Sequence, residues 1–173
     1  MLARRMLQRA RIPWFSLDAL RVGLTRGEPS LGLDLNRDDL DEAKRLWPIL
    51  NELMQNILFW DIDYLVEGSC LAPSSTAELK RQRPDKDIRA IFLGSPELTP
   101  EEKLSLMDAN SVGGNDWLKD QPDQIRLDQA KRIVKDSKIF EKQAVEENLP
   151  FFDTGQDFLA TIDKAETYLF GSQ

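Results

Sequence analysis

The chain of 173 residues contains no histidine and a single cysteine, Cys70. Without histidine, the commonest general base and the commonest metal ligand are missing, so the sequence excludes Ser–His–Asp catalysis and predicts no metal site built by the chain alone. One cysteine also excludes an intramolecular disulfide. No apolar run reaches the roughly 18 residues that a membrane-spanning helix needs. We therefore expect a cytoplasmic protein with no membrane partner.

An excess of basic charge is also lacking, since 23 lysines and arginines face 30 acidic residues and the net charge is −7. A general nucleic-acid-binding protein would carry a basic face, so we expect none of that activity. The composition is nevertheless compatible with a local basic pocket for phosphate. The length suits one domain, spanning residues 1–173, with a sizeable hydrophobic core.

Short apolar runs that predict strands alternate along the chain with longer segments of helical period. The predicted strands are 12–16, 64–66, 88–93 and 149–153. The predicted helices are 1–11, one from Ser16 or Asp18 through Val22, 38–60 with a kink or restart near Pro48, 73–81, one opening at Thr99, 122–147 and 156–170. This alternation predicts βαβ units and a parallel sheet in a three-layer α/β/α sandwich.

Local signals place the helix ends and the loops. The Thr99-Pro100-Glu101-Glu102 sequence is typical of a capping box, and the Pro73–Thr76 stretch of an N-cap. Residues 23–36 are rich in glycine and polar side chains, which predicts a loop, and residues 113–117 predict a turn.

Two acidic residues follow predicted strands directly. Glu67 and Gly68 come after the 64–66 run, at the carboxyl end of a buried strand, where open α/β sheets bind ligands and where glycine permits a close approach. The simpler interpretation is a solvated strand end and an ordinary turn. Asp18 follows the 12–16 strand and shares a helix face with Arg21, although Asp18 could equally be a helix cap.

The order of these pieces resembles the small P-loop kinases, the group that contains adenylate, shikimate and gluconate kinases. The resemblance rests on "IPWFSLDALRVGL", "DYLVEGSCLAP", "IRAIFLG", a charged helical hairpin and "PFFDTGQDFLATIDKAETYL", and it covers nearly the whole chain in element order. None of these motifs is a long signature, so their specificity is moderate.

The resemblance implies an ATP-dependent phosphotransferase with ATP and Mg²⁺ as cofactors and a small-molecule or nucleotide acceptor. Asp18 would hold the acceptor, with Arg21 near its negative groups and Glu67 and Gly68 facing acceptor and metal. Residues 113–147 would form a lid whose cations stabilise the transferring phosphoryl group, although each cation could instead lie on a solvated helix face. The implied lid cations are Arg126, Lys131, Arg132 and Lys138, and the implied adenine-bordering loop is Asp153, Thr154 and Gly155.

One departure from the family is large, because the sequence contains no G-x-x-x-x-G-K-[ST] loop and no strand before it. That loop cradles the phosphates and holds Mg²⁺, so we expect this chain to bind neither cofactor tightly and to be inactive. In the family's 2-3-1-4-5 strand order the missing first strand is the central one. Its loss would expose an apolar seam and favour self-association through the sheet.

Three interpretations follow from the sequence. In the first, the chain is an N-terminally truncated P-loop kinase-like protein whose missing strand and loop lie upstream of Met1. In the second, it is a non-catalytic interaction or regulatory module on the same scaffold. In the third, it is an unrelated α/β enzyme in which Glu67 and Asp18 perform acid–base chemistry.

Overall fold

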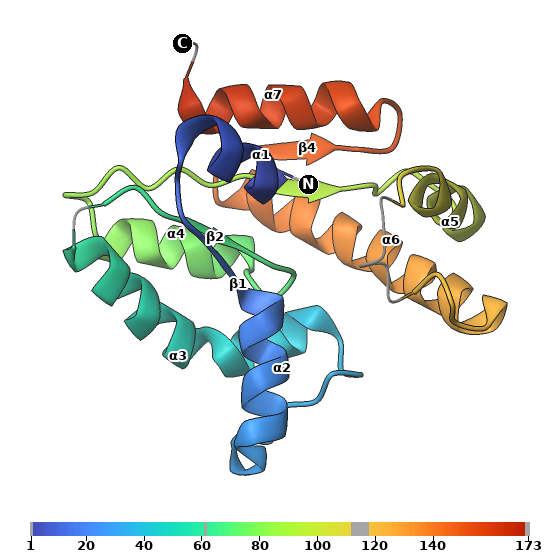
Figure 1. The fold of residues 1–173 in the computed structure, drawn as a ribbon, viewed down its shortest axis with the longest axis horizontal. Coiled ribbons are helices and arrows are strands. Elements are labelled where there is room, and N and C mark those ends of the chain that lie inside the picture. Colours follow the sequence, from blue (N-terminus) through green and yellow to red (C-terminus); the bar gives the residue numbers. More distant parts are fainter. Residues whose placement is uncertain (1, 61, 112–117, 172–173) are drawn as a thin grey trace. The chain divides into compact units, whose positions relative to one another are not determined.

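The computed structural model describes residues 2–60, 62–111 and 118–171, and the chain divides into two compact units, residues 1–88 and 89–173 (Figure 1). Each unit contains one pair of short parallel strands together with helices. The predicted mixed α/β class with parallel strand pairing is therefore confirmed, whereas a single domain over residues 1–173 stays a prediction.

The first unit pairs β1 (Trp14–Ser16) with β2 (Leu65–Glu67) in parallel, and Ser16 lies opposite Glu67. The backbone N–H of Leu65 donates to the Pro13 carbonyl at 3.0 Å, just before the ladder. The other elements of this unit are α1 (Leu2–Ala10), α2 (Leu17–Gly27), the 3₁₀ turn η1 (Pro29–Leu31), α3 (Asp39–Phe59) and α4 (Pro73–Gln82).

The core of the first unit is built on the amphipathic helix α3. Its side chains Leu46, Leu50 and Met54, spaced four residues apart, are buried on one face. Of the predicted kink or restart near Pro48, the restart does not occur, since α3 continues through this exposed proline as one helix. Trp47 adds a link to α4, since its indole N–H donates to Glu78 at 2.8 Å.

The second unit pairs β3 (Phe92–Gly94) with β4 (Phe151–Asp153), again in parallel, with Gly94 opposite Asp153. Its helices are α5 (Pro100–Ala109), α6 (Asp123–Glu146) and α7 (Phe158–Phe170). Helix α6 contacts both strands and α7 contacts β4, so β4 lies between the two helices (Figure 1). The predicted capping box at the start of α5 is confirmed, because Thr99 and Glu102 exchange both expected hydrogen bonds.

Several boundaries differ from the sequence-based predictions. Helix α2 continues to Gly27, so residues 23–27 are helical rather than part of a loop, and the Thr25 hydroxyl donates to the Arg21 carbonyl along the helix. Helix α4 begins at Pro73, which fits the first helical position, and Ala72 is its N-cap. The predicted 88–93 strand is shorter because the partner strand is preceded by Pro150, which has no N–H to extend the ladder. The predicted turn at 113–117 lies outside the described residues.

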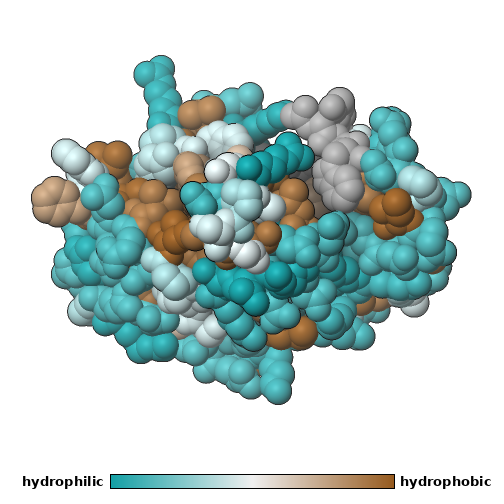
Figure 2. Space-filling view, turned by 90° about the horizontal axis from the view of Figure 1, so that it is seen from below, coloured by the Kyte–Doolittle hydropathy of each residue, from teal (hydrophilic) through white to brown (hydrophobic). Residues whose placement is uncertain are grey.

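On the face drawn in Figure 2, brown apolar side chains interrupt a mostly hydrophilic surface. The most exposed large ones in the first unit are Phe59 at 73%, Trp60 at 65% and Ile62 at 59%. Phe59 and Trp60 make an edge-to-face ring contact with centroids 5.7 Å apart. None of the helices in the described part of the chain combines the length and apolar character required to cross a membrane.

Candidate functional site

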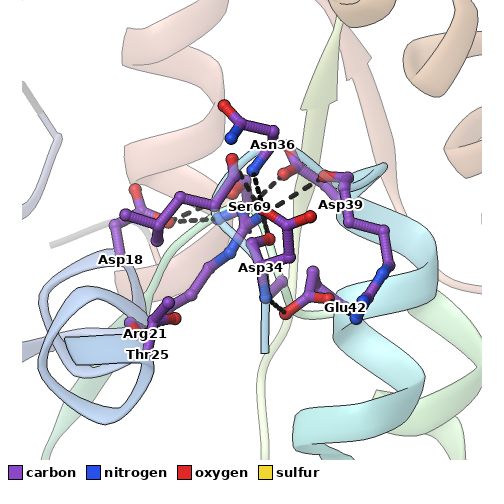
Figure 3. A network of polar contacts seen from close by, with 11 residues as sticks. Asp18, Arg21, Thr25, Asp34, Asn36, Asp39, Glu42 and Ser69 are labelled. Carbon is purple, nitrogen blue, oxygen red and sulfur yellow. Dashed lines mark hydrogen bonds and ion pairs between the residues drawn. The ribbon is translucent and has the colours of Figure 1, made fainter. Parts of the chain in front are cut away.

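The carboxyl ends of β1 and β2 bring Asp18 next to Gly68 and Ser69, while Glu67, the last residue of β2, lies opposite Ser16. Because β1 passes directly into α2 at Leu17, Asp18 is the second residue of the helix and lies beside the chain that leaves β2. One Asp18 carboxylate oxygen, Oδ1, accepts hydrogen bonds from the Ser69 backbone N–H and the Ser69 hydroxyl, both at 3.1 Å (Figure 3). We call Asp18, Glu67, Gly68 and Ser69 the Asp18 cluster.

Gly68 allows this close approach. Its φ of +151° is one that side-chain-bearing residues rarely adopt, and a Cβ there would lie 2.7 Å from the Leu17 Cβ and 3.2 Å from Asp18 Oδ1. A larger residue would therefore push the 68–69 backbone away from α2. The Asp18 side chain is exposed, and its second oxygen, Oδ2, accepts no hydrogen bond from the described residues.

Arg21 does not open onto the Asp18 cluster. It is 6% exposed, and its guanidinium donates to Asp39 Oδ1 at 2.7 Å and contacts the Cys70 sulfur at 3.5 Å. The other guanidinium nitrogen donates to three backbone carbonyls of the loop before α3, which are those of Asp34, Leu35 and Arg37 at 3.0, 3.3 and 3.2 Å. Burial by itself would lower the pKa of Arg21, but the hydrogen bond to Asp39 and the nearby charges raise it, so the guanidinium is cationic.

A second buried charge holds the same loop. Glu42, which is fully buried, accepts hydrogen bonds from the Arg37 guanidinium and from the Asp34 backbone N–H (Figure 3). Sequence reasoning missed Asp39 and Glu42 as partners. The signal was the spacing of Glu42 to Leu46 and Leu50, which places this carboxylate on the buried face of α3.

In the second unit, a chain of polar contacts joins the carboxyl ends of β3 and β4 to α5. Lys103 donates to the Ser95 hydroxyl at 3.1 Å. The Ser95 hydroxyl lies 2.9 Å from the Thr154 hydroxyl, and the Thr154 hydroxyl donates to the Gly94 carbonyl at 2.8 Å. Ser95 is fully buried and Thr154 is 4% exposed. Burial lowers the pKa of Lys103, an effect that the charge of Asp153 partly opposes.

The loop of Asp153, Thr154 and Gly155 is turned by an internal hydrogen bond, since Asp153 accepts from the Gly155 N–H at 2.7 Å. Gly155 also lines an open surface pocket of about 550 Å³. Its other lining residues are Leu98, Glu101, Glu102, Ser105 and Leu106.

The four predicted lid cations lie along α6 and do not converge. Arg126 pairs with Asp108 and, at 3.4 Å, with Asp123, and Lys131 pairs with Asp128 at 3.1 Å. Lys138 is exposed, and the Nε of Arg132 is buried without a hydrogen-bond partner in the described part of the chain. Arg126 and Lys138 are separated along a straight helix by roughly 18 Å, at about 1.5 Å per residue.

The described residues contain no group of three or more Cys, Asp or Glu side chains arranged to hold a metal ion. Comparison with protein families, curated proteins and solved structures found no match.

Proposed function

We propose that the chain carries the scaffold of a small ATP-dependent phosphotransferase of the P-loop kinase type, acting on a small-molecule or nucleotide acceptor. The observation that supports this proposal is the pairing of the strands. The strands of that family lie side by side in the order 2-3-1-4-5, numbered along the family's own chain. Without the family's first strand, its second and third strands form one parallel pair and its fourth and fifth form another. In this chain the parallel pairs β1–β2 and β3–β4 match those two pairs in sequence order and in direction.

The acceptor side of this proposal is the Asp18 cluster. Ligands of parallel α/β proteins bind where strand ends meet helix N-termini, and Asp18 occupies that position after β1. Ser69 donates two hydrogen bonds to Oδ1, and in this proposal Oδ2 accepts a hydrogen bond from an acceptor hydroxyl. Such positioning of the nucleophile is a recurring part of phosphoryl transfer.

The residues of this chain do not fit the triphosphate and Mg²⁺ of ATP by themselves. The phosphate-cradling loop pattern is absent from the 173 residues, and Arg126, the first of the implied lid cations, is engaged by Asp108 and Asp123. Kinase activity would therefore require a strand and phosphate loop from outside these residues. We expect the 173-residue chain to be inactive.

Calorimetry with MgATP tests the family assignment. We expect no saturable binding below millimolar ATP, because micromolar affinity needs about 8 kcal/mol of binding free energy and exposed ion pairs typically contribute only about 0–1 kcal/mol each. Micromolar binding would mean that another loop holds the phosphates, and the P-loop proposal would be abandoned.

The acceptor side has a separate test by NMR titration with nucleoside monophosphates, sugars and small organic acids. We expect the amide shifts to centre on residues 18 and 67–69, and Asp18→Asn to weaken binding. Asp63→Asn is the matched control, because Asp63 is an exposed aspartate just before the amino end of β2. Shifts that lie elsewhere, or equal losses in both variants, would refute the site.

A non-catalytic interaction module remains the second candidate, and the internal engagement of Arg21 and Arg126 favours it. Within the described residues, each strand has one hydrogen-bonded neighbour, so the other edge of each strand lacks a strand partner. We propose self-association through such an edge. Sedimentation velocity should show a dimer whose fraction increases with protein concentration. A monomer at every concentration measured would contradict self-association.

A further inference from the structure

The start of α3 and the loop before it form a pocket lined mostly by cationic residues, in a chain whose net charge is −7. It is an open surface hollow of about 440 Å³. The lining residues are Arg37, Asp41, Lys44 and Arg45. Asp41, Lys44 and Arg45 share one helix face, because they are three and four residues apart.

The Arg37 side chain is held in place by two contacts within the protein. One of its guanidinium nitrogens, Nη1, donates to the buried Glu42 carboxylate and to the Gly32 carbonyl at 3.1 Å. Its Nε and second terminal nitrogen make no hydrogen bond within the described residues. The loop that carries Arg37 is fixed in turn by Arg21, which binds the Arg37 carbonyl.

Burying Arg21 and Glu42 is not an efficient way to stabilise a fold, because the loss of hydration can exceed the attraction between paired charges. Both buried charges act on the same loop, residues 34–37, and so fix the position at which Arg37 presents its free donors. This arrangement is expected of a preorganised binding group rather than of a solvated surface arginine.

The other two cations are also available. Arg45 is exposed and forms neither a hydrogen bond nor an ion pair within the described part of the chain. Lys44 makes only a long 3.7 Å contact with Asp41, and both side chains are more than half exposed, so this pair contributes little. Three of the four lining residues are cations and one is an exposed carboxylate, and Arg37 is in addition paired with the buried Glu42.

We propose that this pocket binds a phosphoryl group, either as free phosphate or as part of a small phosphate ester. The planar guanidinium groups of Arg37 and Arg45 match the geometry of phosphate oxygens, and Lys44 adds a point charge. The volume leaves room for the organic part of an ester. None of Asp18, Glu67 and Gly68 lines this pocket, so the proposal does not depend on the phosphotransferase assignment.

The test is an NMR titration of the 173-residue chain with inorganic phosphate and with glycerol 3-phosphate, at constant ionic strength. We expect saturable shifts confined to residues 32–45. Tighter binding of glycerol 3-phosphate would identify an ester as the ligand, and equal affinity would identify the phosphoryl group alone. Absence of saturation at tens of millimolar of either anion would overturn the proposal.

Two variants of opposite sign sharpen the test. Arg45→Ala removes an exposed side chain without disturbing a buried partner and should weaken phosphate binding about tenfold, the loss of one charge-assisted contact. Asp41→Asn removes the opposing carboxylate and should strengthen binding. Arg26→Ala, at an exposed arginine of α2 outside the pocket, is the charge-matched control and should leave the affinity unchanged. Equal effects of Arg26→Ala and Arg45→Ala would show nonspecific attraction and refute the site.

Discussion

The guanidinium of Arg21 on α2 and the carboxylate of Asp39 in the first turn of α3 lie 2.7 Å apart, and both side chains are largely removed from solvent, at 7% and 16% exposure. The same guanidinium binds three carbonyls of the loop that joins the two helices. The pair therefore fixes the end of that loop to α2.

Replacing Arg21 by methionine should lower the free energy of unfolding by about 3–5 kcal/mol, because it leaves the partly buried Asp39 carboxylate and three carbonyls without their donor. Arg21→Lys should recover only part of this loss, since one ammonium cannot reproduce the planar fork. Urea denaturation measures both. Arg26→Met, at an exposed position of the same helix, should change stability by no more than about 0.5 kcal/mol.

Alanine at two glycines should have opposite effects. Gly68→Ala should destabilise the protein by about 1–3 kcal/mol, since it combines a positive φ with a Cβ 2.7 Å from Leu17. Gly23→Ala lies inside α2 with open space around the new methyl, and should stabilise by about 0.5–1 kcal/mol. Thermal or urea unfolding of the pair measures the difference, and two changes of the same sign would contradict the described geometry.

The Cys70 thiol should resist alkylation in the native protein. Burial raises its pKa to about 11, although the charge of Arg21 partly opposes this, so the reactive thiolate is scarce at pH 8. Iodoacetamide labelling followed by mass spectrometry should be slow in buffer and fast in urea. Equal rates under both conditions would show that the thiol is accessible in the native state.

Lys103 should make stability depend on alkaline pH in a defined direction. Burial lowers its pKa below the usual 10.5, so the folded protein releases this proton before the unfolded chain does. The cost of burying the charge is present at neutral pH and is relieved as the pH rises through the folded pKa toward 10.5. The stability of the wild type relative to Lys103→Met should therefore increase over this range.

Paired urea titrations from pH 7 to 10.5 measure that difference, and contributions from other titrating groups largely cancel between the two proteins. Lys142→Met provides the control, because the Lys142 side chain is 77% exposed and pairs only loosely with Glu146. A flat difference for Lys103→Met, or one that falls with pH, would contradict the described burial.

The sequence predicted the strand–helix alternation from its short apolar runs, and it grouped Asp18, Arg21 and Glu67 at one site on the rule that parallel strands end at one edge. It did not predict the burial of Arg21. The pattern paired Arg21 with Asp18, three residues earlier, but the residue four before it is Leu17, which is fully buried and places Arg21 on the inward face.

Contacts that join distant segments could not be predicted from local pattern. Ser95, Lys103 and Thr154 come from three separate elements, and nothing in their own neighbourhoods marks them as partners. Three of the four predicted strands, 12–16, 88–93 and 149–153, are longer than the observed ones for a related reason. Apolar β-branched runs indicate strand propensity, but the ladder ends where the partner strand ends, as it does at Pro150.

The pairing within each unit has a consequence for how the protein folds. Trp14 meets Leu65 and Phe92 meets Phe151, so each ladder closes a long stretch of chain, which slows folding relative to local contacts. Both strands of the first ladder, β1 and β2, belong to the first unit, which ends at residue 88 and is therefore synthesised before the second. At about 5–20 residues per second, translation gives the β1–β2 ladder several seconds to form on the ribosome before Phe151 is synthesised.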